Sequence, residues 1–194
     1  MTNREIEIKI KLTDAEALKK KVESLGGKKV SEDLEQDIYY DNDSGLYDSG
    51  KVLRLRKLNN GNLLTVKDPQ EEHENLLIRG ETQTSVADFD RMHEILQKLG
   101  FKEKYRKEKF STHYLLDGME LLFHKLPFLG DFLEIEANEQ ALKNFLPRLG
   151  LSIEQGLNRG YHKLFMEYCK QQDWPENTPL TFEEERNKIG KRNH

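Results

Sequence analysis

The chain has 194 residues, which is enough for one domain with a sizeable core or for one closed barrel. Its 31 Lys and Arg residues nearly balance 35 Asp and Glu residues, and the net charge of −4 excludes a broad basic surface for duplex nucleic acid. The single cysteine, Cys169, excludes an internal disulfide framework. The N-terminus has no apolar leader, and no apolar run reaches about 18 residues, so we expect a cytoplasmic protein that does not enter a membrane.

The first third of the chain predicts a strand, a helix and three further strands. In EIEIKIKL (5–12), isoleucines alternate with charged residues, as in a strand with one apolar face. Thr13 is the predicted cap of a helix over 14–27, which two glycines end. The three further strands are predicted over 33–42, 51–58 and 62–68, and Asn60-Gly61 predicts a hairpin between the last two.

The same pattern restarts after a loop that contains Pro69. A strand over 76–84 precedes a helix over 86–100, which Ser85 is expected to cap. The later strands are predicted over 101–117, 119–126 and 131–137. Because both helices end in Leu-Gly and both are followed by three strands, residues 4–68 and 76–137 are predicted to be duplicated halves.

Two further helices and a polar tail are predicted at the C-terminal end. The helices span 139–150 and 152–172, and Thr181 and Glu184 have the spacing of a capping box that opens a short helix in the tail. We therefore expect one domain over 1–170 and a peripheral polar tail over 171–194.

The predicted strands alternate charged and aliphatic residues and do not form continuous apolar runs, which favours antiparallel pairing. Eight such strands in two similar halves predict an α+β fold. The expected architecture is an eight-stranded antiparallel β-barrel, or tunnel, with a polar lumen and flanking helices.

Charged residues of like sign recur two positions apart and therefore share a strand face, as Glu5 and Glu7 do. One explanation is an ordinary sheet with a solvated outer face. Like charges on neighbouring positions repel, however, and a bound ligand with metal ions would supply the opposing charge. The alternative is a closed barrel in which the charged faces line the lumen and the apolar faces pack outward against helices.

In that closed barrel the lumen holds an acidic group and a basic group. The acidic group is Glu5, Glu7, Glu81, Glu134 and Glu136. The basic group is Lys9, Lys11, Arg54, Arg56, Lys67, Arg79 and one or more of Arg106, Lys107 and Lys109. Carboxylate oxygens suit Mg²⁺ or Mn²⁺, and guanidinium and ammonium groups suit phosphate oxygens. Together the two groups indicate a metal-bound polyphosphate.

A family resemblance agrees with this interpretation. EIEIK (Glu5, Glu7, Lys9) matches a Glu-x-Glu-x-Lys signature, and the similarity continues in order through YYDNDSGLYDSGKVLRLRK, TVK, RGE, YRKEKF, LGDFLEIE and RGYHKLF. Over roughly residues 3–168 the chain resembles the CYTH domain, or triphosphate tunnel metalloenzyme, family. That family includes class IV adenylyl cyclases, thiamine triphosphatases and inorganic or RNA triphosphatases. The resemblance implies a tunnel that binds a triphosphate with divalent metal ions.

The resemblance also implies roles for individual residues. Metal ligands or their supports would be Glu5, Glu7, Glu134 and Glu136. Phosphate ligands would be Lys9, Arg54, Arg56, Lys67, Arg79, Arg106 and Lys107. Glu81 is the implied tunnel carboxylate, and we expect Lys9 and Lys11 to tune or relay a proton. At His124 the chain departs from the family pattern, which commonly has an aspartate facing the metals; the imidazole is a ligand for Mn²⁺ or an ordinary barrel residue.

The leading hypothesis is a metal-dependent triphosphatase. The alternatives are an adenylyl cyclase that uses the same site, a non-catalytic binder of polyphosphate or nucleotide, and a structural barrel without a ligand. The substrate is expected to be a small triphosphate, with no duplex nucleic acid and no membrane partner, and a homodimer stays open. The sequence does not distinguish inorganic triphosphate, thiamine triphosphate, nucleotides and RNA 5′ ends.

Overall fold

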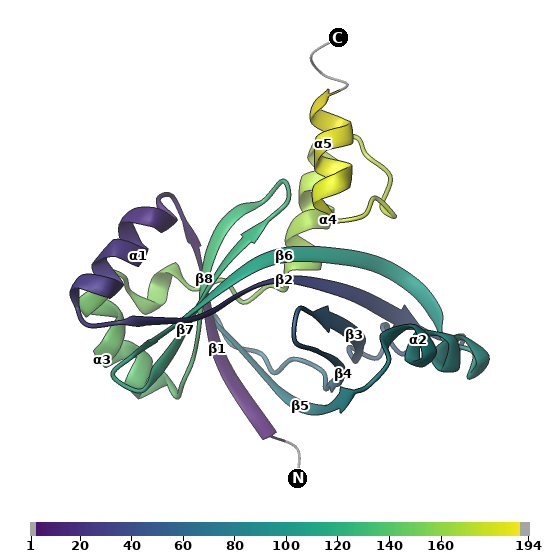
Figure 1. Cartoon of the computed structure of the whole chain (residues 1–194), viewed down its shortest axis with the longest axis horizontal. Coiled ribbons are helices and arrows are strands. Elements are labelled where there is room, and N and C mark those ends of the chain that lie inside the picture. Colours follow the sequence, from purple (N-terminus) through teal and green to yellow (C-terminus); the bar gives the residue numbers. More distant parts are fainter. Residues whose placement is uncertain (1–2, 191–194) are drawn as a thin grey trace.

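Eight strands close into one antiparallel barrel in a computed structural model that describes residues 3–190 (Figure 1). The strands are β1 (Asn3–Leu12), β2 (Lys28–Asp41), β3 (Val52–Leu58), β4 (Gly61–Lys67), β5 (Leu76–Val86), β6 (Lys102–Leu116), β7 (Met119–Leu126) and β8 (Gly130–Glu136). The helices are α1 (Ala15–Ser24), α2 (Phe89–Lys98), α3 (Glu139–Leu149), the 3-10 turn η1 (Ile153–Gln155), α4 (Tyr161–Gln171) and α5 (Phe182–Gly190). The predicted fold class is confirmed. Residues 1–2 and 191–194, which belong to the predicted domain and tail, lie outside the described residues.

The strand order is β1-β5-β4-β3-β2-β6-β7-β8, and β8 pairs with β1 to close the barrel. If each strand of the first half is exchanged with its counterpart in the second half (β1 with β5, β2 with β6, β3 with β7 and β4 with β8), every strand keeps the same neighbours around the barrel. The first strands of the two halves pair with each other, as do the second strands, and a helix follows each first strand. The topology is therefore what the predicted duplication requires.

Two helices begin later than the sequence suggested. The side chain of Asp14, not Thr13, accepts a hydrogen bond from the backbone N–H of Ala17 at 2.9 Å and caps α1. Asp88, not Ser85, caps α2 in the same way. Ser85 instead belongs to β5, where it pairs with Leu63 of β4. An aspartate is at least as good an N-cap as serine or threonine, and at α2 the earlier residue, Ser85, is part of a strand pair.

The single helix predicted over 152–172 is broken into η1 and α4. Gly156 forms a bridge with Ile10 of β1, and the N–H of Leu157 donates to the carbonyl of Lys9 at 2.7 Å. The backbone at Gly156 and Leu157 therefore pairs with β1 and does not form the hydrogen bonds of a helix. The chain then turns at Gly160, and α4 starts at Tyr161.

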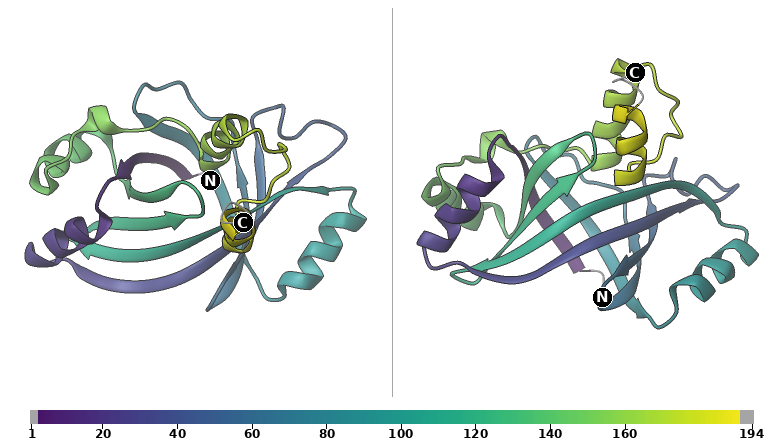
Figure 2. Two further views of the ribbon diagram at one scale, coloured as in Figure 1. Left: turned by 90° about the horizontal axis from the view of Figure 1, so that it is seen from above. Right: turned by 45° about the horizontal axis from the view of Figure 1, so that its top comes forward.

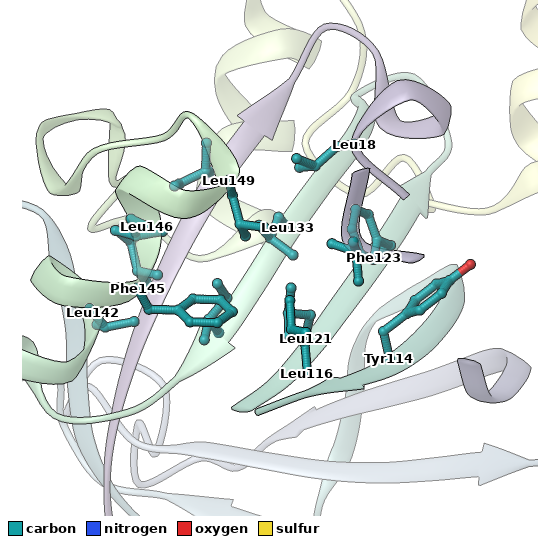
Figure 3. Close-up of a cluster of buried hydrophobic side chains, with 14 of the residues drawn as sticks. Leu18, Tyr114, Leu116, Leu121, Phe123, Leu133, Leu142, Phe145, Leu146 and Leu149 are labelled. Carbon is teal, nitrogen blue, oxygen red and sulfur yellow. The ribbon is translucent and has the colours of Figure 1, made fainter. Parts of the chain in front are cut away.

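The apolar faces of the strands pack outward against the helices. The largest core joins α1 and α3 to the outer sides of β1, β7 and β8, and Figure 3 shows leucines of both helices meeting Leu121, Phe123 and Leu133 of the barrel. A second core packs α2 on β2 and β3, with Leu55 fully buried and Leu96 nearly so. Burial of this apolar area stabilises the fold and leaves the opposite, charged strand faces to the interior.

A third core sits at the base of α4. Phe132, Tyr161, Phe165, Cys169 and Leu180 form it, so the helix and the following tail are anchored to the barrel. α4 and α5 stand together on one side of the barrel, away from α1 and α3 (Figure 2).

The tail continues along β6. Leu180 exchanges backbone hydrogen bonds with Arg106 and Glu108, and Thr181 caps α5 by accepting from the N–H of Glu184 at 3.2 Å. Among the described residues no helix is both long and apolar enough to cross a membrane.

Candidate active site

A cavity of about 700 Å³ lies inside the barrel, and its walls are the charged strand faces. The predicted residues that line it are Glu5, Glu7, Lys9, Arg54, Arg56, Lys67, Arg79, Glu81, Lys107, Lys109, Glu134 and Glu136. Strand pairing explains this convergence, because inward positions lie opposite inward positions on each neighbour. Glu7 pairs with Glu136, and Lys67 pairs with Glu81. The ordinary sheet with solvated charges is therefore wrong for these faces.

The acidic group occupies three adjacent strands, β5, β1 and β8. Burial raises the pKa of Glu5 to about 7 despite the nearby ammonium of Lys67. Burial and the neighbouring Glu134 carboxylate raise the pKa of Glu7, and burial and Glu7 do the same for Glu136. Burial is the main cause of these raised pKa values, and repulsion between the carboxylates adds to it, so a bound cation would stabilise their ionised forms.

Two lysines partly neutralise the acidic group. The Lys9 ammonium lies 3.2 Å from Glu7 and 3.1 Å from Glu134, and Lys67 forms an ion pair with Glu81. Burial opposes the charge of Lys9, but the carboxylates of Glu7 and Glu134 outweigh it and raise its pKa. Lys9 therefore stays protonated and acts as a fixed cation.

The basic group faces two buried carboxylates that the sequence analysis did not single out, Glu35 and Asp37 of β2. Arg56 donates to Asp37 at 2.6 and 2.9 Å and lies 2.5 Å from Glu35. Lys107 lies 3.0 Å from Asp37, and Lys109 lies 3.4 Å from Glu35. A neighbouring strand therefore supplies the counter-charge that the sequence analysis assigned to a ligand.

These ion pairs and burial shift the pKa values of the two carboxylates and of Lys109. Although burial opposes it, Lys109 and Arg56 lower the pKa of Glu35 to about 2, and Arg56 and Lys107 hold the pKa of Asp37 well below its ordinary range. Burial lowers the pKa of Lys109 to about 8. Arg54 is less engaged than Arg56, because its Nη2 donates to Thr65 at 3.2 Å while its buried Nε has no hydrogen-bond partner among the described residues.

Two predicted residues do not line the cavity. Lys11 is exposed, and the ring of Phe132, its pairing partner on β8, lies 6.0 Å from its ammonium. The side chain of Arg106 is 54% exposed and pairs with Glu103. On β6 the inward residues are Lys107 and Lys109, two of the three residues named for the lumen, and Arg106 lies on the outer face.

His124 is a buried member of the site. Its Nε2 atom lies 2.8 Å from Glu134 and 2.9 Å from Lys109, and Nδ1 is buried without a partner among the described residues. Burial and the Lys109 charge lower its pKa. His124 thus links the acidic group to the basic group.

Aromatic residues complete the walls. Tyr39 and Tyr105 reach the cavity from β2 and β6, and Tyr161 and His162 reach it from the start of α4. Tyr161 places its ring 4.3 Å from the Lys9 ammonium, so α4 also helps to hold the lysines of the lumen. The strand alternation could have indicated Tyr39, whereas the position of α4 depends on the closed barrel.

The carboxylates Glu5, Glu7 and Glu136 offer the hard oxygen donors that Mg²⁺ and Mn²⁺ prefer, and their raised pKa values favour a bound cation. Within residues 3–190, no three His, Cys, Asp or Glu side chains already converge as a metal site. The donor chemistry therefore fits a divalent metal ion, and binding would require the side chains to move together.

Comparisons with known proteins agree with the architecture. The family model described as CYTH domain matches residues 3–161. A Methanocaldococcus jannaschii protein provisionally named adenylate cyclase is 29% identical over 133 residues, which cover 68% of this chain and 75% of that protein. The adenylate cyclase CyaB of Aeromonas hydrophila is 28% identical over 174 residues, covering 82% and 87%. A solved structure from Pyrococcus horikoshii, 28% identical, has a TM-score of 0.69 and covers 81% of this chain and 96% of its own.

Proposed function

Because this chain belongs to the CYTH domain family, we propose that it is a metal-dependent enzyme that hydrolyses a triphosphate held inside the barrel. The observation that carries the proposal is the meeting of an acidic and a basic group in one cavity of about 700 Å³. A metal-bound polyphosphate has the complementary charges.

The basic residues would bind the phosphate oxygens. Arg54 is the best placed, because its buried Nε has no hydrogen-bond partner within residues 3–190 and a guanidinium suits phosphate geometry. Lys9 and Lys107 would offset the charge that builds on the non-attacking oxygens. Arg56 is held by Glu35 and Asp37, so it would act mainly by keeping the wall of the cavity in place.

The acidic residues would hold the metal ion and the attacking water. Glu5, Glu7 and Glu136 would be the ligands, with Glu134 fixed behind them by Lys9 and His124. A bound Mg²⁺ or Mn²⁺ would supply charge neutralisation of the phosphates and would lower the pKa of water. Glu5 would share this ion, so it would be ionised with the metal bound and would not accept the water proton, and the activated water would release its proton to solvent. Lys9 stays charged, and Lys67 lowers the pKa of Glu81 against the effect of burial, so neither is the proposed acceptor.

A second candidate is cyclisation of a nucleoside triphosphate. The names of the two curated relatives favour it. In that reaction the ribose hydroxyl attacks the α-phosphorus and pyrophosphate leaves, so the same basic and acidic groups would serve. The two reactions differ in their products, which are orthophosphate for hydrolysis and a cyclic nucleotide with pyrophosphate for cyclisation.

The test is a panel of inorganic triphosphate and organic triphosphates, each with Mg²⁺ and with Mn²⁺. A Glu5→Gln/Glu7→Gln double variant should lose orthophosphate release, whereas Glu71→Gln/Glu94→Gln, which changes two exposed carboxylates, should retain it. Cyclic nucleotide as the main product would favour the second candidate. Triphosphate binding without turnover under either metal would reject both.

A further inference from the structure

One mouth of the cavity has an aromatic wall that a triphosphate alone does not need. Tyr39 and Tyr105 stack at 4.2 Å between ring centroids, and Tyr105 and His162 stack at 3.8 Å, with interplanar angles of 11° and 9°. Tyr47 meets His162 edge-on at 6.0 Å. Four rings from β2, β6, the loop after β2 and α4 therefore form one continuous column, and all four line the cavity.

Apolar residues share the wall with this column, and two lysines lie over its rings: Lys104 is 4.5 Å from the ring centre of Tyr47, and Lys107 is 5.2 Å from that of Tyr39. Gly50, Val52 and Pro69 line the same cavity, and a side chain added at Gly50 would meet Pro69 at 3.2 Å. Burial and nearby lysines lower the pKa of His162 to about 4, so its ring is neutral at neutral pH. The mouth therefore offers apolar and aromatic surface in a cavity whose interior is strongly charged.

The column lies directly beside the proposed phosphate ligands. Lys107 and Tyr105 are both inward residues of β6, two positions apart, which is roughly 7 Å along a strand. The ammonium of Lys107 also donates to the Tyr39 hydroxyl at 2.8 Å. A ligand with phosphates at Lys107 would therefore extend its other end along the rings.

The volume of the cavity supports a ligand larger than triphosphate. Pockets of about 300–1,000 Å³ enclose ligands of drug size, and this cavity measures about 700 Å³. Aromatic rings also pair through edge-to-face contacts. Tyr39 and His162 cover the two faces of Tyr105, so a ligand ring would meet the exposed edge of the column.

We propose that the column of Tyr39, Tyr47, Tyr105 and His162 binds the planar ring of an organic triphosphate, and that the protein prefers such substrates to inorganic triphosphate. This inference rests on the proposed function, because it assumes that the phosphates occupy the basic group. The ring of the substrate would then lie outside the basic residues that bind its phosphates.

The test compares three ligand types: ATP with GTP and CTP, butyl triphosphate as a ring-free ester, and inorganic triphosphate. Dissociation constants are measured by calorimetry with Ca²⁺, and kcat/KM with Mg²⁺ or Mn²⁺. Wild type should prefer the ring-bearing triphosphates at least tenfold over butyl triphosphate. Loss of an aromatic edge contact predicts that Tyr105→Ala and His162→Ala each lower this preference about 2- to 10-fold while binding of inorganic triphosphate changes little.

Two controls separate ring binding from support of α4. Tyr47→Ala removes a ring that touches the column only at one edge, so it should reduce the preference without lowering the melting temperature. Tyr168→Ala removes a ring of α4 that packs on Phe128 and Trp174 outside the cavity, and it should leave the preference unchanged.

Equal affinity of wild type for ring-bearing and butyl triphosphates, or an equal loss for all ligands in the variants, would overturn the inference. Hydrolysis of inorganic triphosphate would still support the proposed function in that case. A ring preference in binding without turnover of any triphosphate would instead support the inference and reject the enzymatic function.

Discussion

The guanidinium of Arg56 and the carboxylate of Asp37 form a buried, two-pronged ion pair across β2 and β3, at 2.6 and 2.9 Å. The Asp37 side chain is fully buried, and Lys107 reaches it from the opposite neighbouring strand, β6. One carboxylate therefore joins three strands of the barrel inside the lumen. It thereby joins the basic residues of this wall to one another.

Removing the charge of Asp37 should destabilise the fold strongly. Asp37→Asn removes the carboxylate partner of the buried Lys107 and one of the two carboxylates that pair with Arg56, which keeps Glu35. Loss of one member of a buried pair lowers the free energy of unfolding by about 3–5 kcal/mol. Urea unfolding measures the change. The matched control is Glu71→Gln, which breaks an equally short two-pronged pair with Arg4 on the surface, worth about 1 kcal/mol or less. Similar losses in both variants would contradict a structural role for Asp37.

The sequence predicted the barrel, its polar lumen and most residues of the acidic and basic groups, because strand alternation assigns each side chain to a face. The same rule places Glu35 and Asp37, two like charges two positions apart on β2, on one face of the strand, but they were not among the predicted lumen residues. It could not decide between Arg106 and Lys107, because the face of a strand depends on its pairing register, and β2 and β6 shift register between Tyr39 and Tyr40. His162 was beyond it, since α4 reaches the lumen only after the barrel closes.

Arg54 and Arg106 offer a direct test of the corrected face assignment. Arg54→Gln removes an inward guanidinium and should lower kcat/KM for triphosphate hydrolysis roughly 100-fold or more, as expected for a donor to developing negative charge. Arg54→Lys should recover part of the activity, since it keeps the charge without the fork. Arg106→Gln changes an exposed side chain and should leave kcat/KM within about twofold. Steady-state kinetics with melting temperatures would show the opposite pattern if Arg106 were the phosphate ligand.

Lys9 and Lys11 form a second matched pair on one strand. The buried Lys9 ammonium lies between Glu7 and Glu134, so Lys9→Gln should abolish most activity, at roughly 100-fold or more. Lys11→Gln should retain it, because Lys11 is exposed beyond Phe132. Orthophosphate release under saturating metal measures both. A loss of activity in Lys11→Gln at an unchanged melting temperature would restore the proton-relay role that the sequence suggested.

The raised pKa of Glu5 predicts how stability depends on pH. The folded protein holds the Glu5 proton up to about pH 7, whereas the ordinary value is 4.5, so between these values the folded state binds more protons than the unfolded state. Ionised Glu5 therefore weakens the fold as pH rises through this window. Relative to wild type, Glu5→Gln should gain stability from pH 4.5 to 7 and then level off. Saturating Mn²⁺ should remove this gain, because the ion stabilises ionised Glu5 in the wild type. Thermal unfolding of both proteins across this range measures the difference, and a flat difference without metal would contradict the assigned pKa.

Gly156 determines how closely the chain before α4 approaches the barrel. A Cβ atom at this position would lie 2.2 Å from the carbonyl oxygen of Asn75 and 3.0 Å from that of Ile153, and both are backbone atoms that cannot turn aside. Gly156→Ala should therefore displace the segment that delivers Tyr161 and lower the free energy of unfolding by about 1–3 kcal/mol, the usual effect of overpacking. Activity should fall as well, since Tyr161 supports the Lys9 ammonium. Gly190→Ala is the control, because a Cβ there meets nothing within 4 Å. Urea unfolding and steady-state kinetics on both variants test whether this segment supports the site as well as the fold. A lower free energy of unfolding without any change in kcat/KM would show that the segment supports the fold but not the site.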